Sequence, residues 1–418
     1  MRLTNPIISS YQLNLSPMIT PSTYLYLLST YLHTTVTIDN WSVSYPSRKS
    51  NVRRQRTFSP STPFPCQDSI SWGRSKEVPT SVHKLRPGDI EVVAAIGDSL
   101  VAGSGALEEF ALGAIVEYRG VSWCAGGDSS WREFLTLPNI LKEYNPGLRG
   151  YSTGTGEWLS KNSRLNVAFP VASDQDAYKQ AKILVARIRS SPDIDVARDW
   201  KMITVFIGAN DLCSASCLSP VSWSPAAHAK KLAKALDYFH EHLPRTIINL
   251  IPVLDVSVSV RVVRPLMCRL MHPLFCTCFH RGGGELLDLV RQARLYQAAE
   301  MALVDSGRYD TRDDFTVVIQ PFMRLFNAPL PPTQPLPLVI HQSYITHDCF
   351  HFSQKGHALA ANLLWNNLLE PVGNKTDSGP PVLLNSFRCP IKSAPFIFTR
   401  KNSEEYLRTG KQDGAFES

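Results

Sequence analysis

The sequence predicts an α/β fold, a three-layer sandwich in which helices flank a central, mostly parallel sheet. Short β-branched runs recur from residue 90 onward, amphipathic stretches of helical length separate them, and two of the runs end in turn-forming residues. Strands that alternate with helices favour parallel pairing, because each connection must cross a face of the sheet before the next strand begins. Both faces of such a sheet are covered, and its strands are buried.

Five apolar runs are the predicted strands, at residues 91–96, 165–169, 202–207, 246–254 and 315–319. Three stretches are the predicted helices, at residues 176–189, 226–242 and 356–369. In the first of these helices Ala181, Leu184 and Ile188 recur at three- and four-residue steps, which gives one apolar face. The order of strands and helices therefore supports the α/β class along most of the chain.

The amino-terminal part has a different composition. Residues 1–63 are rich in Ser, Thr, Tyr and Pro and show no lasting periodicity. Because such a composition buries little apolar surface, we expect a variable, poorly ordered segment that closes with the linker SPSTPFP. The chain after Glu370 contains Pro and Gly and is predicted to be irregular.

Composition and charge exclude some classes of function. The 418 residues are 44% hydrophobic, enough for one large domain or two small ones. The net charge of +7 lies partly in short runs such as RRQR at residues 53–56, without interleaved aromatic side chains. This pattern predicts weak attraction to anionic surfaces and no nucleic-acid binding. No segment approaches the ~18 apolar residues of a spanning helix, and residues 24–38 make a poor signal peptide.

The nine cysteines include two close pairs, Cys213 with Cys217 and Cys276 with Cys278. Neither spacing matches a zinc site, so no metal is expected. Local disulfides within each pair of an exported protein fit these spacings better, with free buried thiols as the alternative. The odd count means that at least one thiol is unpaired or pairs outside the chain.

Side chains that suit acyl transfer follow the ends of separate apolar segments. Ser99 follows the first strand, Asn210 follows the run 202–207, and Asp348 and His351 precede the last predicted helix. Each alone has an ordinary explanation: a turn serine, a helix-cap asparagine, a structural histidine. Because the carboxyl ends of parallel strands meet at one edge, the set together supplies a nucleophile, an oxyanion donor, a base and an orienting carboxylate.

Three short motifs resemble blocks of the GDSL, or SGNH, hydrolase superfamily: GDSL at residues 97–100, GAND at 208–211 and DCFH at 348–351. Longer segments resemble the animal phospholipase B group within it, including PTSVHKLRPGDIEVVAAIGDSLVAGSGA, VEYRGVSWCAGGD and HDCFHFSQKGHALAANLLWNNLLEPVG. The similarity runs over residues 64–403. It implies one flavodoxin-like SGNH domain over that range, with residues 404–418 as a tail.

The resemblance also implies a role for each residue. Ser99 would be the nucleophile, and its backbone N–H would be one oxyanion donor. Asn210 would donate a side-chain N–H to the same oxygen. His351 would act as the base, and Asp348 would orient the His351 ring.

One block departs from the family pattern. Where the family has glycine in a motif like NxAxxGA, this chain has Val171. The donor needed there is a backbone N–H, which valine retains, so Val171 is expected in the oxyanion hole with Ser99 and Asn210. A β-branched residue would be strained if the position requires a positive φ, and its side chain could crowd the acyl pocket.

Neighbouring residues have competing explanations. His347 is a rival base, but its spacing does not match the family block. Asp98 and Asp211 are expected to fix turns by accepting backbone hydrogen bonds. Trp123 and Trp131 could line an acyl groove or belong to the core.

The resemblance implies a serine esterase that hydrolyses fatty-acyl esters of glycerophospholipids and lysophospholipids through an acyl-enzyme on Ser99. No cofactor is required, because serine chemistry uses neither a metal nor a redox group. The expected partners are lipid substrates and a lipid or membrane surface, with no nucleic acid, and the chain is expected to be a monomer. Family members imply secretion or the extracellular face of the plasma membrane, although the chain shows no clear signal peptide or anchor. The alternatives are an SGNH carboxylesterase acting on other esters, or a catalytically impaired lipid-binding homologue.

Overall fold

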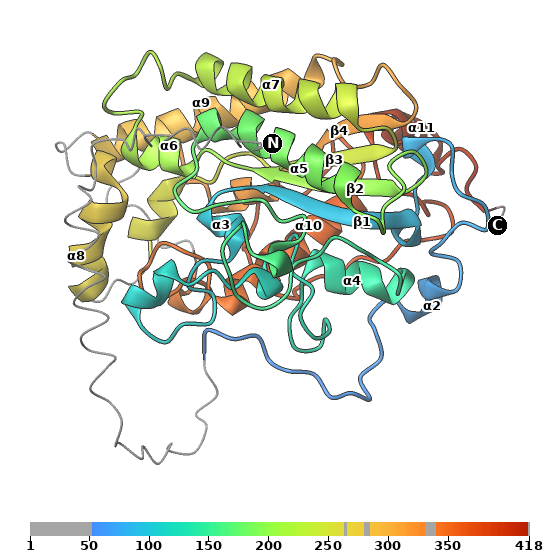
Figure 1. Ribbon diagram of the computed structural model, residues 1–418, viewed down its shortest axis with the longest axis horizontal. Helices are drawn as coiled ribbons and strands as arrows, with labels where there is room; N and C mark the ends of the chain where they lie inside the picture. Colours follow the sequence, from blue (N-terminus) through green and yellow to red (C-terminus); the bar gives the residue numbers. More distant parts are fainter. Residues whose placement is uncertain (1–51, 263–265, 280–284, 331–339, 417–418) are drawn as a thin grey trace, which may run out of the picture. The chain divides into compact units, whose positions relative to one another are not determined.

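The computed structural model describes residues 52–262, 266–279, 285–330 and 340–416 (Figure 1). Its parallel sheet has the order β1-β2-β3-β4, with β1 Ile90–Gly97, β2 Trp200–Phe206, β3 Thr246–Leu250 and β4 Phe315–Ile319. Each adjacent pair is parallel. The α-helices are α2 Gln67–Ile70, α3 Ser99–Ala102, α4 Leu137–Tyr144, α5 Ala177–Ser190, α6 Ala209–Ser214, α7 Pro225–His242, α8 Leu266–Phe275, α9 Glu285–Asp305, α10 Gln354–Leu368 and α11 Arg400–Thr409.

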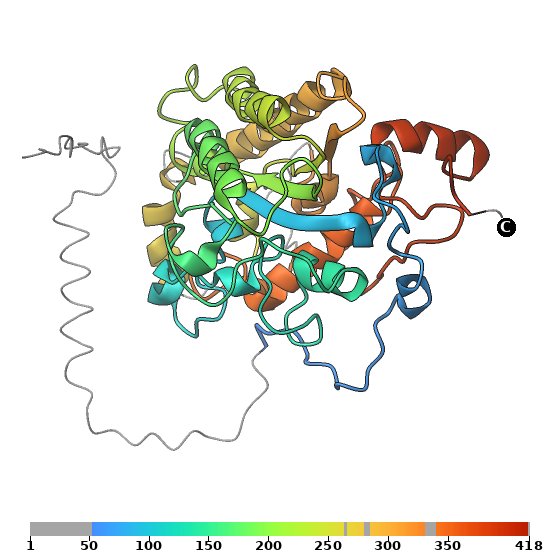
Figure 2. The ribbon, with the colours of Figure 1, turned by 45° about the vertical axis from the view of Figure 1, so that its right-hand side comes forward.

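Helices cover both faces of the sheet. On β1, Val92, Ala94 and Ile96 pack against the apolar faces of α5 and α7, whereas Val93 and Ala95 pack in a second cluster with α4 and α10. Figure 2 shows the green helices α5 and α7 on one side of the blue strand β1 and the teal α4 on the other. The predicted three-layer α/β class is therefore confirmed.

The predicted strand at 165–169 is wrong as a regular strand. This segment lies beside β1, but it forms one isolated parallel bridge, between Ala95 and Asn166. The amide of Ala95 donates to Leu165, and those of Val167 and Phe169 donate to β1. On the other side a buried arginine binds two of the segment's carbonyls, where a further strand would otherwise pair. The remaining predicted strands and helices are present, with ends shifted by a few residues.

The described part of the chain begins before the predicted boundary at residue 64. Residues 1–51 of the segment expected to be poorly ordered lie outside the described residues. Arg53 donates to the Ile345 carbonyl at 2.9 Å, and the Gln55 N–H donates to the Gln354 side chain at 2.7 Å. Near the other end α11 continues to Thr409. The domain limits 64 and 403 stay predictions.

The predicted local disulfides are wrong, because the cysteines pair between segments. Within the described residues the bonds are Cys66–Cys389, Cys213–Cys276, Cys217–Cys278 and Cys268–Cys349. The two close pairs join each other because α6 packs against the short 3₁₀ helix η8 (Thr277–Phe279). The expected unpaired thiol is the buried Cys124.

Candidate active site

The first strand brings the Gly97-Asp98-Ser99 turn to the carboxyl-end edge of the sheet (Figure 1). The Asp98 carboxylate accepts the Leu100 N–H at 2.9 Å and caps α3, which begins at Ser99. From α5, the Gln180 amide makes two hydrogen bonds to the backbone of Gly97, each 2.8 Å long. The turn before the serine is therefore fixed on both sides.

Ser99, His351 and Asp348 lie in one hydrogen-bonded chain. His351 Nε2 is 2.9 Å from Ser99 Oγ, and His351 Nδ1 is 2.5 Å from Asp348 Oδ2. All three side chains are buried. Because the carboxylate accepts from Nδ1–H, the neutral ring leaves Nε2 as the acceptor for the serine hydroxyl. The structure thus brings together three residues that sequence analysis selected from distant segments.

The surroundings of Asp348 keep its carboxylate ionised. Burial alone would raise its pKa, but His351 and hydrogen bonds from Thr346 and Phe350 hold the pKa below its usual value. Oδ1 accepts the Thr346 hydroxyl, the Phe350 N–H at 2.8 Å and the His351 N–H at 3.1 Å. An ionised carboxylate in this place can orient the histidine ring and stabilise positive charge on it.

Asp98 makes no hydrogen bond to the side chains of Ser99, His351 or Asp348. Its side chain is buried, and burial raises the pKa of the carboxyl to about 7. Oδ1 accepts the Leu100 N–H, while Oδ2 has no hydrogen-bond partner among the described residues. This contact with the turn backbone agrees with the structural role expected for Asp98.

Asn210 lies at the start of α6, at the same edge of the sheet. Gly208, the residue before this helix, has φ 127°, which only glycine adopts readily. Asn210 Nδ2 donates to the Ala172 carbonyl at 2.9 Å. A side-chain amide has two N–H donors, so this bond leaves one for another acceptor. The bond to Ala172 also places Asn210 next to the segment that carries Val171.

Val171 has a positive φ, which is the condition under which sequence analysis expects strain at this position. Its φ is 55°, in the left-handed region that β-branched residues disfavour. Its side chain is 82% exposed, so it projects into solvent and does not fill a buried pocket. The backbone at this position is strained, and packing of the valine side chain does not compensate for that strain.

The competing residues lie elsewhere. The imidazole bonded to Ser99 belongs to His351 and not to its rival His347. Trp123 packs on Phe206, and Trp131 packs on Phe64, both inside the core. Both tryptophans are therefore core aromatics.

Sequence analysis missed the side chains that support the site from behind. Gln180 holds Gly97, Thr346 binds Asp348, and Arg119 binds carbonyls of the segment before Val171. Thr346 could have been noticed from its place two residues before Asp348. For Gln180 and Arg119 the sequence carries no local signal, because their partners are far along the chain.

Behind Asn210 is a buried cluster of a kind that can hold a metal ion: Asp174, Asp211 and His228. Its ligand atoms already have protein partners. Asp174 accepts from Lys231 at 2.7 Å and lies 3.2 Å from His228 Nδ1, and His228 Nε2 lies 3.1 Å from Glu300. Both Asp211 oxygens accept the Asp174 N–H, at 3.2 and 3.1 Å. These contacts form a network of acidic and basic side chains that are hydrogen-bonded to one another.

The chain is similar in sequence to phospholipases of three mammals. It is 42% identical over 339 residues to "Phospholipase B1, membrane-associated" of Homo sapiens, which covers 79% of this chain and 23% of the relative. It is 38% identical over 373 residues to the protein of the same name from Mus musculus, covering 86% and 24%. The chain thus spans about a quarter of the length of the curated relatives it matches.

A family comparison agrees with the geometry. The family described as GDSL-like Lipase/Acylhydrolase matches residues 93–364, more than half of the chain. The matched range includes every predicted site residue: Ser99, Val171, Asn210, Asp348 and His351. The resemblance inferred from the short motifs is confirmed, and the chain belongs to the GDSL-like lipase/acylhydrolase family.

Proposed function

We propose that this chain hydrolyses fatty-acyl ester bonds of glycerophospholipids and lysophospholipids, combining phospholipase A and lysophospholipase activity in one site. The observation that carries the proposal is the hydrogen-bonded chain from Asp348 through His351 to Ser99. Family membership supports the ester class of substrate, and the names of the relatives support lipids. Because the chain spans about a quarter of those relatives, their activity is a proposal for this chain.

In the first half of the reaction, Ser99 Oγ attacks the ester carbonyl. His351 Nε2 accepts the hydroxyl proton and then donates it to the leaving alcohol, a lysophospholipid or a glycerophosphodiester. The ionised Asp348 stabilises the imidazolium that forms between these two steps. A positioned base of this kind typically accelerates such a reaction by about 10²–10⁴.

The negative charge on the carbonyl oxygen needs donors in a fixed place. In the proposal these are the backbone N–H groups of Ser99 and Val171 and the Asn210 side-chain amide. One such donor is typically worth about 10²–10³ in rate. Asn210 is fixed beside the Val171 segment by its bond to Ala172.

In the second half, water replaces the alcohol. His351 takes a proton from the water, whose oxygen attacks the acyl-enzyme, and Ser99 leaves with a proton returned by His351. The fatty acid is released and the starting state is restored. Every step uses side chains and backbone groups of this chain, so no cofactor is required.

Two other functions are compatible with the fold. An SGNH carboxylesterase acting on short or sugar-borne acyl groups would use the same residues. A catalytically impaired lipid-binding homologue is favoured by one observation, the valine at φ 55° in the expected oxyanion loop.

A serine-directed fluorophosphonate probe and a substrate series separate the three. We expect the probe to label the wild type and not Ser99→Ala, and the wild type to release fatty acid from phosphatidylcholine and lysophosphatidylcholine. Activity on short p-nitrophenyl esters alone would exclude the phospholipase. A folded wild type that is neither labelled nor active would leave the impaired homologue.

We further propose that the chain works in an exported compartment, as a monomer at a lipid surface. The four disulfides of the described residues favour an oxidising environment. The relatives' printed name, membrane-associated, supports a location at a membrane. Among the described residues, no helix has the length and apolar character needed to cross a bilayer.

A further inference from the structure

The strained Val171 backbone needs an explanation, because contacts of the valine side chain do not stabilise it. Its side chain is 82% exposed and its φ is 55°, so neither packing nor local preference stabilises this conformation. The segment on each side of Val171 must supply the constraint. On both sides the segment is bound by the buried side chain of an ionisable residue.

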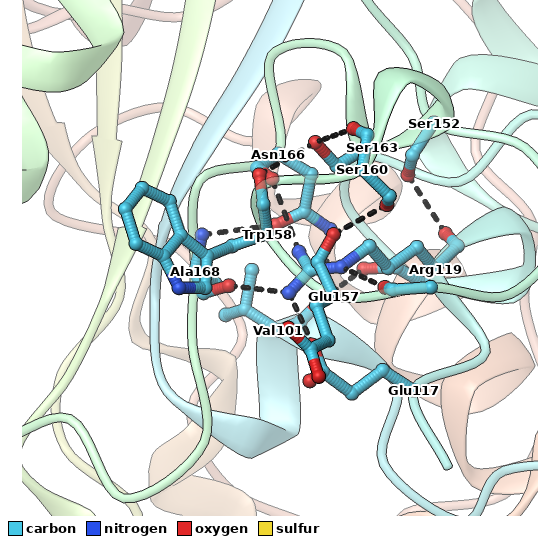
Figure 3. A network of polar contacts seen from close by, with 12 residues as sticks. Val101, Glu117, Arg119, Ser152, Glu157, Trp158, Ser160, Ser163, Asn166 and Ala168 are labelled. Carbon is cyan, nitrogen blue, oxygen red and sulfur yellow. Dashed lines mark hydrogen bonds and ion pairs between the residues drawn. The ribbon is translucent and has the colours of Figure 1, made fainter.

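On the amino-terminal side the charged group is Arg119, shown in Figure 3. Its side chain is fully buried and is paired with Glu117. Nη1 donates to the Asn166 carbonyl at 3.0 Å, and Nη2 donates to the Ala168 carbonyl at 2.6 Å. One planar guanidinium therefore fixes two carbonyls of the segment, a geometry that lysine cannot reproduce.

Asn166 connects this clamp to the nucleophile. Its side-chain Nδ2 donates to the carbonyl of Val101 in α3, at 3.1 Å, and its Oδ1 accepts the Ala168 N–H at 3.3 Å. The segment that leads to Val171 is therefore held in register with the helix that begins at Ser99.

On the carboxyl-terminal side the buried ionisable residue is Asp211, the residue after Asn210. Its carboxyl group accepts the backbone N–H of Asp174, three residues beyond Val171. Asp174 in turn lies against His228 and Lys231. Asp211, Asp174 and His228 are fully buried. This second clamp ties the segment after Val171 directly to the helix that carries Asn210.

The second clamp holds more acidic than basic side chains. Asp174, Asp211 and Glu300 are three carboxyls that face two cations, His228 and Lys231. Burial, together with the neighbouring Asp174, raises the pKa of Asp211. Although burial opposes it, hydrogen bonding to Asp174 and Glu300 raises the pKa of His228 to about 9. An asparagine at position 211 keeps a side-chain oxygen that can accept the Asp174 N–H.

We propose that Arg119 and Asp211 are positioning residues, which hold the strained Val171 N–H and the Asn210 amide in place as oxyanion donors. The inference rests on the proposed function, since it assigns these donors to an ester oxygen. It goes further in that two buried residues, Arg119 and the aspartate of the GAND motif, control the rate without touching the substrate. A structural role alone would affect stability and not the chemistry of the bound ester.

The test is a double-mutant cycle with Val171→Gly, since glycine adopts a positive φ without strain. Asp211→Leu removes the acceptor of the Asp174 N–H, and we expect kcat to fall by about 10- to 100-fold, as for a donor displaced by about 1 Å. KM should change less than threefold, because the substrate still binds. In the Val171→Gly background the same substitution should cost less than about threefold, because the loop no longer needs the clamp.

Conservative variants separate positioning from folding. Asp211→Asn keeps an acceptor for the Asp174 N–H and should retain most of kcat. Arg119→Lys loses the geometry that binds two carbonyls. Combined with Val171→Gly in a second double-mutant cycle, it should give the same pattern of kcat losses. This second cycle tests the proposal even if Asp211→Leu does not fold. The matched control is Glu370→Leu, which removes a buried carboxylate that binds Arg388 and Thr376 beyond the end of α10. It should lower the melting temperature and leave kcat within about twofold.

Each outcome decides between the proposals. Equal losses of kcat in the wild-type and Val171→Gly backgrounds, or losses that match the control at equal melting temperature, would overturn the positioning role while the esterase proposal stands. A wild type that hydrolyses no ester and is not labelled by the fluorophosphonate would overturn both.

Discussion

His351 Nε2 and Ser99 Oγ lie 2.9 Å apart, although 252 residues separate them in the chain. The contact exists because β1 and the loop before α10 both end at the same edge of the sheet. It is the one place where the described part of the chain joins a hydroxyl nucleophile, a ring nitrogen able to accept its proton and a carboxylate behind the ring. The following predictions test what this arrangement and its supports do.

Loss of the nucleophile or the base should abolish turnover. We expect Ser99→Ala and His351→Ala each to lower kcat/KM by at least about 10⁴, because they act as one unit. The measurement is hydrolysis of lysophosphatidylcholine and of a p-nitrophenyl ester, with circular dichroism to show that the fold is intact. His347→Ala is the neighbouring control and should keep its activity. A variant lacking His351 that retained turnover would identify another base.

Loss of the Asn210 amide should leave a trace of activity. Asn210→Ala removes one donor to the developing oxyanion, and we expect kcat to fall by about 10²–10³ with KM nearly unchanged. Steady-state kinetics on the same esters give the two parameters separately. A rise in KM with unchanged kcat would mean that Asn210 binds the ground-state substrate instead.

Asp98 should make stability depend on pH. Its folded-state pKa of about 7 lies above the value of an ordinary aspartate. Folding therefore takes up a proton, so the stabilising contribution is complete below about pH 4 and is lost as the pH rises to about 7. Asp98→Asn stays neutral throughout. Between pH 5 and pH 8 the wild type should lose about 2 kcal/mol more of its unfolding free energy than the variant does. Equal pH slopes in urea unfolding would contradict this.

Glycine at position 171 should stabilise the fold. A non-glycine residue at φ 55° carries strain of about 1–3 kcal/mol, against which glycine adds up to about 1 kcal/mol of chain entropy to the unfolded state. Val171→Gly should therefore raise the unfolding free energy by about 1 kcal/mol. Val171→Ala, which keeps a Cβ at the same φ, is the control and should not reproduce the gain. A less stable glycine variant would show that the valine side chain makes favourable contacts.

The disulfide in the loop between the proposed catalytic residues Asp348 and His351 should matter for rate. Cys349 lies between Asp348 and His351, has φ 59° and is bonded to Cys268 of α8. Replacing both cysteines with serine releases the loop, and we expect kcat to fall by about tenfold or more through misplacement of the triad.

The control for this variant is the Cys66–Cys389 bond, which joins residues 323 apart in the chain. Replacing that pair with serine should lower the unfolding free energy by about 2–5 kcal/mol while kcat is retained. Equal effects of the two pairs on kcat would mean that both act only through overall stability.

Much of this protein is visible in its sequence. Element types follow from local periodicity, so the helix at Ala177–Ser190 and the strand at Phe315–Ile319 were predicted nearly to the residue. The turn before Ser99 and the three-residue spacing of Asp348 and His351 are local features too, and motif spacing identified all three residues.

The failures have one physical cause. The apolar pattern of residues 165–169 predicts a strand. However, Arg119 donates hydrogen bonds to two of their carbonyls, and no local sequence pattern indicates that partner. The spacing of the cysteines suggested local pairs, but α6 packs against η8, and each cysteine of one pair is bonded to a cysteine of the other pair. Both outcomes depend on contacts between segments far apart in the chain.

The sequence by itself therefore determined most of the strands and helices and the choice of candidate site residues, because these depend on residues that are neighbours in the chain. Only the tertiary structure decided how the expected oxyanion loop is held. The φ of Val171, the raised pKa of Asp211 and the buried contacts of Arg119 each follow from partners that folding brings together. The energy of a strained backbone or a buried charge depends on its surroundings, and those surroundings exist only in the folded chain.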